Sequence, residues 1–270
     1  MRLAVGMAVL LAATFIGAPA SAQLAIDRLW VDFEPGTPPR ADVVIRNESA
    51  DRYYITVAPA EIVNPGEESE ARVVESDPEK LGLLVSPNRL VVDPGGMRSI
   101  RIVSLNPTVV RDRVYRIRVS PEVGEIQAGD PGSGNRGVSV KLLTAYDLLV
   151  TVRPAKPDAK LTMTRTPTEM VIRNAGNTNT LLFEGRACTA EAKQDAVAEA
   201  KPDAGEAAKP DAPTSTAAPA STALAKGCAD LGARRLYAGN EWKIPIEPAA
   251  KQVRFKERKL SSADPKEISF

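Results

Sequence analysis

The sequence predicts an all-β protein made of two consecutive β-sandwich domains. Short runs of alternating apolar and polar residues, separated by Pro, Gly, Asn and Asp, are typical of antiparallel strands. The length of 270 residues is more than twice that of one sandwich of about 100 residues. In addition, Pro154 and Pro157 interrupt the chain near its middle, where neither can donate a hydrogen bond to a sheet.

Residues 1–22 predict a cleaved signal peptide. Arg2 precedes an apolar run that ends in Ala20-Ser21-Ala22, a pattern of small residues typical of a cleavage site. The expected mature chain begins at Gln23, and a membrane anchor is the alternative interpretation. No later segment is apolar for long enough to span a bilayer, so we expect an exported protein without a further membrane span.

The charges give no support to nucleic-acid binding. The chain has 35 Lys and Arg against 34 Asp and Glu, so its overall field favours no charged partner. Arginine is nevertheless frequent between Arg98 and Arg118, which allows a local basic face, whereas 61–79 is acidic apart from Arg72.

Residues 23–153 form the expected first domain, an immunoglobulin-like sandwich. Pro and Gly mark the turns at 34–36, 64–66 and 93–96, and a Gly-rich loop is expected at 125–137. The expected strands are 24–33, 41–46, 53–59, 89–92, 97–105, 113–120 and 138–152.

The last of these strands is the most informative. Its apolar residues alternate over about fifteen residues, against the usual five or six, which suggests that part of it serves another purpose than its own sandwich. Two shorter strands bent at Thr144 are the alternative. One face carries Val138, Val140, Leu142, Thr144, Tyr146, Leu148, Val150 and Val152.

A short linker at 154–158 leads to the expected second domain, 159–270. An Ala-, Lys- and Pro-rich tract at 189–226 has almost no large apolar residue, so we expect a disordered insertion, with helix in its Ala- and Glu-rich part as the alternative. The expected strands are 161–165, 169–173, 180–187, 234–237, 242–246 and 252–257.

Cys188 and Cys228 are the only cysteines, and they flank this insertion. In an exported protein an even pair suggests one disulfide, with two buried thiols as the alternative. A bridge here joins the two ends of the insertion and contributes about 3 to 4 kcal/mol by the loop-closure expression.

Residues that build common catalytic sites are missing. The chain contains no His, which excludes Ser-His and Cys-His nucleophiles and His metal sites. No phosphate-binding Gly-x-x-x-x-Gly-Lys-Ser/Thr motif occurs, and the glutamates near Glu68 are typical of a solvated loop. We therefore expect no enzyme, no cofactor and no metal site.

Several motifs follow one another in an order found in a known family. They are the run LVSPNRLVVDPGGMRSIRI from Leu84 to Ile102, Arg113-Val114-Tyr115-Arg116-Ile117, Val152-Arg153-Pro154, and Asn174-Ala175-Gly176-Asn177. With the signal peptide, they resemble the PapD-like periplasmic chaperones of the chaperone/usher pilus pathway. The resemblance covers the mature chain apart from the insertion. It implies two immunoglobulin-like domains in a boomerang arrangement, located in the periplasm.

The resemblance also implies a mechanism and partners. In this family the last strand of the first domain, called G1, completes the open sheet of a pilus subunit through donor-strand complementation, and the chaperone then meets an outer-membrane usher. Val138, Val140, Leu142 and Thr144 fall on the positions that fill the subunit groove, with Thr144 less apolar than the family prefers.

The charged residues of the family match only in part. The family holds the subunit's C-terminal carboxylate with an Arg and a Lys, whose positions here correspond to Trp30 and Leu149. Arg28 and Lys141 are the nearest basic candidates. Arg153 and Asp112 match the residues of an interdomain ion pair.

Two other functions are compatible with the sequence. One is a structural or adhesive immunoglobulin-like module on the cell surface, which would not need the long alternating strand. The other is a chaperone for a secreted client that is not a pilus subunit.

Overall fold

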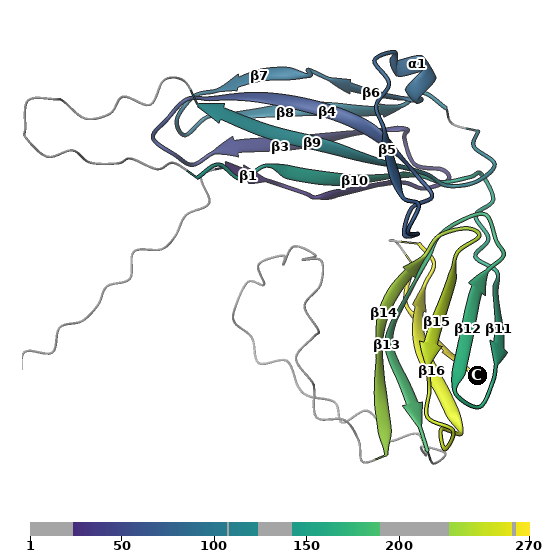
Figure 1. Cartoon of the computed structure of the whole chain (residues 1–270). Helices are drawn as coiled ribbons and strands as arrows, with labels where there is room; N and C mark the ends of the chain where they lie inside the picture. The colour runs from purple at the N-terminus through teal and green to yellow at the C-terminus, as the bar shows by residue number, and fades with distance from the viewer. Residues whose placement is uncertain (1–23, 107, 124–141, 190–226, 261–262) are drawn as a thin grey trace, which may run out of the picture.

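The computed structural model describes residues 24–106, 108–123, 142–189, 227–260 and 263–270. It shows two β-sandwiches joined at a bend (Figure 1). The predicted fold class, all-β with two immunoglobulin-like sandwiches, is therefore confirmed. The predicted signal peptide at 1–22 lies outside the described residues, as do residues 190–226 of the predicted insertion.

The first sandwich packs two sheets against each other. One sheet has the order β1-β3-β8-β6, and the other has the order β2-β10-β9-β4-β5, with β7 also paired to β4. A single helical turn, α1 (Pro78–Leu81), precedes β6. The strands are β1 (Leu24–Ile26), β2 (Trp30–Phe33), β3 (Arg40–Asn47), β4 (Tyr53–Val63), β5 (Ala71–Val73), β6 (Leu83–Ser86), β7 (Arg89–Val92), β8 (Met97–Ser104), β9 (Arg113–Val123) and β10 (Tyr146–Val152).

The core of this domain lies between the two sheets. Alternate residues of each strand point inward, as the period-two pattern predicts. Their burial supplies the main favourable term for folding of the domain. Fully buried members include Val43, Ile45, Ile100 and Ile102 from one sheet and Ile117, Leu148 and Val150 from the other.

The predicted strand 24–33 is wrong, because the chain changes sheets within it. β1 pairs with β3 of one sheet, whereas β2 runs parallel to β10 of the other. At the break, the carboxylate of Asp27 accepts a hydrogen bond from the backbone N–H of Val44 at 2.9 Å. The carboxylate thus takes the place of a backbone acceptor for the N–H of Val44, and the backbone can leave the first sheet.

Three elements of the first domain were not predicted: β5, α1 and β6. The helical turn is short, and its signals are local. The Asp77 carboxylate accepts from the N–H of Glu79, and Gly82 ends the turn with a φ of 75°.

The second sandwich has sheets of three and four strands, in the orders β11-β12-β15 and β14-β13-β16-β17. Met170, Ile172, Leu182, Leu236 and Phe255 form the centre of its core. The predicted strand 234–237 is longer in the structure, and β17 was not predicted. The strands are β11 (Leu161–Arg165), β12 (Glu169–Asn174), β13 (Thr180–Cys188), β14 (Cys228–Leu236), β15 (Glu241–Pro245), β16 (Gln252–Arg258) and β17 (Lys266–Ser269).

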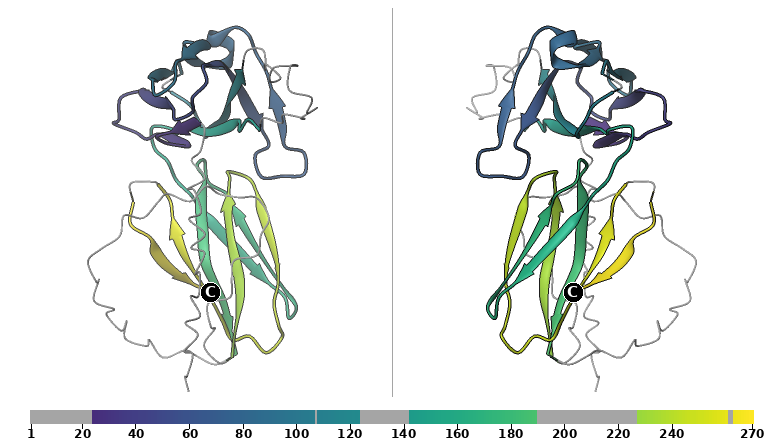
Figure 2. Two further views of the ribbon diagram at one scale, coloured as in Figure 1. Left: turned by 90° about the vertical axis from the view of Figure 1, so that its left-hand side faces the viewer. Right: turned by 90° about the vertical axis from the view of Figure 1, so that its right-hand side faces the viewer.

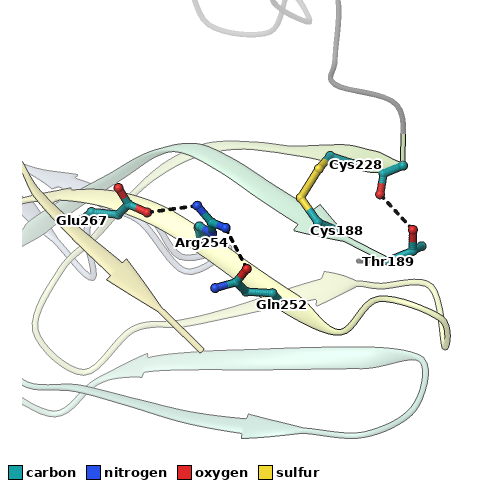
Figure 3. Close-up of a disulfide and its surroundings, with 7 residues drawn as sticks. Cys188, Thr189, Cys228, Gln252, Arg254 and Glu267 are labelled. Atoms are coloured by element: carbon teal, nitrogen blue, oxygen red, sulfur yellow. Dashed lines mark hydrogen bonds and ion pairs between the residues drawn. A yellow bond between two sulfur atoms is a disulfide. The ribbon is translucent and has the colours of Figure 1, made fainter. Parts of the chain in front are cut away.

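The predicted disulfide between Cys188 and Cys228 is present (Figure 3). The two cysteines are directly opposite each other at the ends of β13 and β14. Beyond them, the N–H of Thr189 donates to the carbonyl of Gly227 at 2.9 Å. The bridge thus closes the hairpin where residues 190–226 leave it.

Candidate functional site

Large apolar side chains are exposed mainly on the first domain. Among the described residues, every strongly exposed member of this group lies between Trp30 and Leu143, and none lies in the second sandwich. Exposed apolar surface of this kind often marks a protein interaction site. The group comprises Trp30, Tyr54, Val63, Val73, Val74, Leu84, Val91, Met97, Leu105, Val110, Leu142 and Leu143.

Of the predicted long strand 138–152, the structure describes residues 142–152, and only Tyr146–Val152 form a strand. Its regular part is β10, in which Leu148, Val150 and Val152 are buried, so the predicted inward face is present from Tyr146 onward. Residues 142–145 adopt no strand. Leu142 is 81% exposed, and Thr144 is also exposed. Val138, Val140 and Lys141 lie outside the described residues.

The strand begins at Tyr146 because the chain is anchored there. The Tyr146 ring packs against the core, and its hydroxyl donates to the carbonyl of Leu24 in β1. β10 starts opposite Val119, whereas β9 continues to Val123 and keeps pairing with β4. Within the described residues, the last residues of β9 therefore have no partner on the β10 side, which leaves an open edge beside residues 142–145.

The two positions predicted to correspond to the basic pair of the resembled family lie side by side. Trp30 of β2 and Leu149 of β10 are directly paired, and Trp30 is 50% exposed. Arg28 lies in the bend before β2, where its guanidinium is 3.0 Å from the carboxylate of Asp27. The cation nearest to the pair in the sheet is Arg116, which is paired with Leu149 from the other side.

Arg116 was not singled out from the sequence, although a signal was present. In the strand predicted at 113–120, Tyr115, Ile117 and Val119 are the apolar residues of one face and are fully buried. Arg116 and Arg118 alternate with them and therefore belong to the outer face.

The domain junction contains a buried cation. The side chain of Arg153 is 2% exposed, and its guanidinium donates to both carboxylate oxygens of Asp32, at 2.7 and 2.8 Å. It also donates to the hydroxyl of Thr178 in the second domain at 2.7 Å. Burial opposes the charge, but the contacts with Asp32 and Asp112 outweigh it and raise the pKa of Arg153.

Asp112 contacts Arg153 less closely and binds mainly the second domain. The nearest nitrogen–oxygen distance between the two side chains is 3.9 Å. The Asp112 carboxylate accepts from the backbone N–H of Asn179 at 2.6 Å and from its side-chain amide at 2.5 Å. Burial raises the pKa of Asp112, because these hydrogen bonds and the nearby Arg153 compensate it only in part.

The loop between β4 and β5 forms a second contact between the domains, where it reaches toward the second sandwich (Figure 2). The side-chain amide of Asn240 donates to the carbonyl of Pro65 at 2.8 Å, and Arg234 donates to that of Gly66 at 3.2 Å. Together with the Arg153 network, these contacts hold the domains at two separate points.

The described residues offer neither a metal site nor a membrane helix. No cluster of three or more acidic or cysteine side chains among them could hold a metal ion. No helix in this part of the chain is long and apolar enough to cross a membrane.

No protein-family profile matches the chain. A curated relative, a CS1 fimbrial subunit of Escherichia coli, is 27% identical over 134 residues, which make up 49% of this chain and 56% of that protein. The chain thus spans about half the length of that relative.

Solved structures match over nearly the whole chain. The class 5 fimbriae chaperone CfaA has a TM-score of 0.63 at 17% identity, covering 92% of this chain and 97% of that one. A chaperone–tip adhesin complex of CFA/I fimbriae biogenesis gives a TM-score of 0.60 at 15% identity, covering 92% and 98%. At such low identities, the structural likeness shows the fold alone. The chain therefore has the two-domain fold of the chaperones of chaperone/usher pilus assembly, and the resemblance seen in its sequence is confirmed at that level.

Proposed function

We propose that the chain is a periplasmic chaperone that captures fimbrial subunits through donor-strand complementation. The segment that precedes β10 would supply the strand that a subunit lacks, without a cofactor, a metal or catalysis. An outer-membrane usher would then receive the complex. The description of one structural neighbour as a chaperone–tip adhesin complex supports this class of partner.

The observation that carries the proposal is the exposed apolar segment beside an open sheet edge. Leu142 is an even number of residues away from Leu148 and Val150, which are buried in β10, yet Leu142 is 81% exposed. If the chain extended as a strand before Tyr146, Leu142 would continue the inward-facing row beyond the end of its own sandwich. A subunit with an incomplete sandwich could bury that row and pair with the free backbone groups.

The attachment of β10 also supports the proposal. Because Tyr146 ties the start of β10 to β1 and Arg153 ties its end to Asp32, a bound strand would be held at a fixed register. Such fixed register would place alternate side chains in defined pockets of the subunit.

The structural or adhesive alternative does not account for this segment. A structural or adhesive module gains nothing from an exposed apolar segment next to an open edge, which is an aggregation hazard. A non-pilus client would use the same edge, so the identity of the captured protein distinguishes that case.

The test compares two exposed apolar positions. The tagged full chain is co-expressed with fimbrial subunits from the bacterium that encodes it, and co-purification is measured for Val140→Glu/Leu142→Glu and for Val110→Glu. Val110 is 90% exposed and lies between β8 and β9, away from the edge. We expect the double variant to co-purify with about tenfold less subunit than the Val110→Glu control does, since charges replace two apolar side chains that the complex would bury. Equal capture by the edge variant and the control would contradict the proposal.

A further inference from the structure

A row of arginines crosses the outer face of the sheet that contains the proposed binding edge. Arg116 and Arg118 project from β9 on the side opposite to the core residues Ile117 and Val119. Arg89 of β7 is paired with Thr56 of β4, and Leu90 and Val92 beside it face the core, so Arg89 also lies on the outer face. We call Arg89, Arg116 and Arg118 the arginine strip.

The β4 side chains next to the strip are small. Arg116 is paired with Ala60, and Arg118 with Ala58, while Thr56 lies between Arg89 and Ser120. Ala58 and Arg118 are exposed, whereas Ala60 is buried and Arg116 is half-buried. The guanidinium of Arg116 donates to the backbone carbonyl of Asp147 at 3.4 Å.

Within the described part of the chain, no carboxylate is ion-paired with the strip. Among the described residues, none of its arginines forms an ion pair. Asp147, which is paired with Arg118 in the sheet, is bound instead by Arg72 of β5. Glu122 lies at the far end of the face, opposite Tyr54. The nearest acidic group is thus already occupied.

The positive charge is a local feature. In the described part of the first domain, Asp and Glu outnumber Arg and Lys. Arg116 and Arg118 are about 7 Å apart along the strand, from the usual rise of about 3.4 Å per residue. Like charges at this spacing repel each other within a Debye length, and an acidic partner relieves that repulsion.

We propose that the arginine strip binds an acidic segment of the captured subunit. The inference rests on the proposed function, because β9 carries the strip and forms the open edge next to residues 142–145. A subunit paired at that edge begins one strand away from Arg118. Exposed Trp30 and Tyr54 lie at the two ends of the strip, and Arg, Trp and Tyr are the residues enriched in energetically important interface positions.

The first test needs no subunit. A fluorescent peptide of alternating Val and Asp, and its Val–Lys counterpart, are titrated against the full chain by anisotropy at 20 and 150 mM salt. The variant is Arg89→Gln/Arg116→Gln/Arg118→Gln. The matched control is Arg40→Gln/Arg46→Gln/Arg98→Gln, which removes three exposed arginines of β3 and β8 that form no ion pair within the described residues.

We expect the acidic peptide to bind the unmodified chain and the control alike, and the strip variant about tenfold more weakly at low salt, since each exposed charge contact contributes modestly. The Val–Lys peptide should bind weakly to all three. Equal binding of the acidic peptide by variant and control overturns the proposal. So does a strip-dependent loss that appears only with phosphatidylglycerol vesicles or oligothymidylate, because the occupant is then a lipid surface or a nucleic acid.

The second test measures subunit capture by the same variants. We expect the subunit to associate more slowly with the strip variant than with the control. The difference should be largest at low salt. If the unmodified chain captures no fimbrial subunit, the proposed function fails, and the peptide titration still decides whether the strip binds acidic segments. If capture is normal and equally fast in all variants, the function stands and the strip proposal is wrong.

Discussion

Removal of the disulfide should destabilise the second domain by an amount set by the chain length between its cysteines. Cys188 and Cys228 are 40 residues apart in the sequence. The loop-closure expression assigns about 4 kcal/mol to a bridge over such a loop, mainly by restricting the unfolded chain. Because the two cysteines are already opposite each other on paired strands, the replacement Cys188→Ala/Cys228→Ala removes few folded-state contacts.

A shortened hairpin separates this entropic effect, which depends on loop length, from the loss of contacts made by the cysteines themselves. Replacing residues 190–226 by Asn-Gly reduces the closed loop to about six residues, and the same expression then gives about 2 kcal/mol. The assay is urea unfolding of both chain lengths, each with and without the two alanines. We expect the alanine pair to cost about 2 kcal/mol more in the full chain than in the shortened one. An equal loss in both, or a larger loss in the shortened chain, would refute the reasoning.

Two further predictions concern the domain junction. Arg153→Met should cost about 3 to 5 kcal/mol in urea unfolding, because it leaves Asp32 and Asp112 buried without their cation; a loss below about 1 kcal/mol would contradict this. Asp112→Asn tests the raised pKa of that carboxyl. The folded chain holds the Asp112 proton more tightly than the unfolded chain, so its contribution to stability is present at low pH and lost as the pH rises through the raised pKa. The unmodified chain should therefore gain stability relative to Asp112→Asn between pH 7 and pH 4, and a pH-independent difference would show that the pKa is not raised.

The regular strands could be predicted because their information is local. In the second domain the pattern of 161–165 predicts β11 without error, since alternating residues must face one core. The break at Asp27–Leu29 could not be predicted, because it depends on which sheet each half of the segment joins. That choice depends on β3 and β10, which are far away in the sequence.

In the candidate site, too, local features could be predicted from the sequence, whereas contacts with distant strands could not. Alternation identified the face of β10 correctly, but not its beginning at Tyr146, which is set by the hydrogen bond to Leu24 in another sheet. Arg153 was singled out with Asp112, whereas the structure gives it a closer partner in Asp32. Arg116 shows its importance only when β10 is placed beside β9, because its neighbours Leu149 and Trp30 belong to other strands.

Hydrogen exchange of the chain with and without a bound fimbrial subunit tests the central claim most directly. The amides of residues 142–145, which form no strand in the described structure, should become protected in the complex, because a donated strand pairs its backbone with the subunit. Protection should also extend to the amides of residues 138–141. Unchanged exchange over residues 138–145, with new protection confined to the β1-β3-β8-β6 sheet or to the second domain, would contradict donor-strand complementation through this edge.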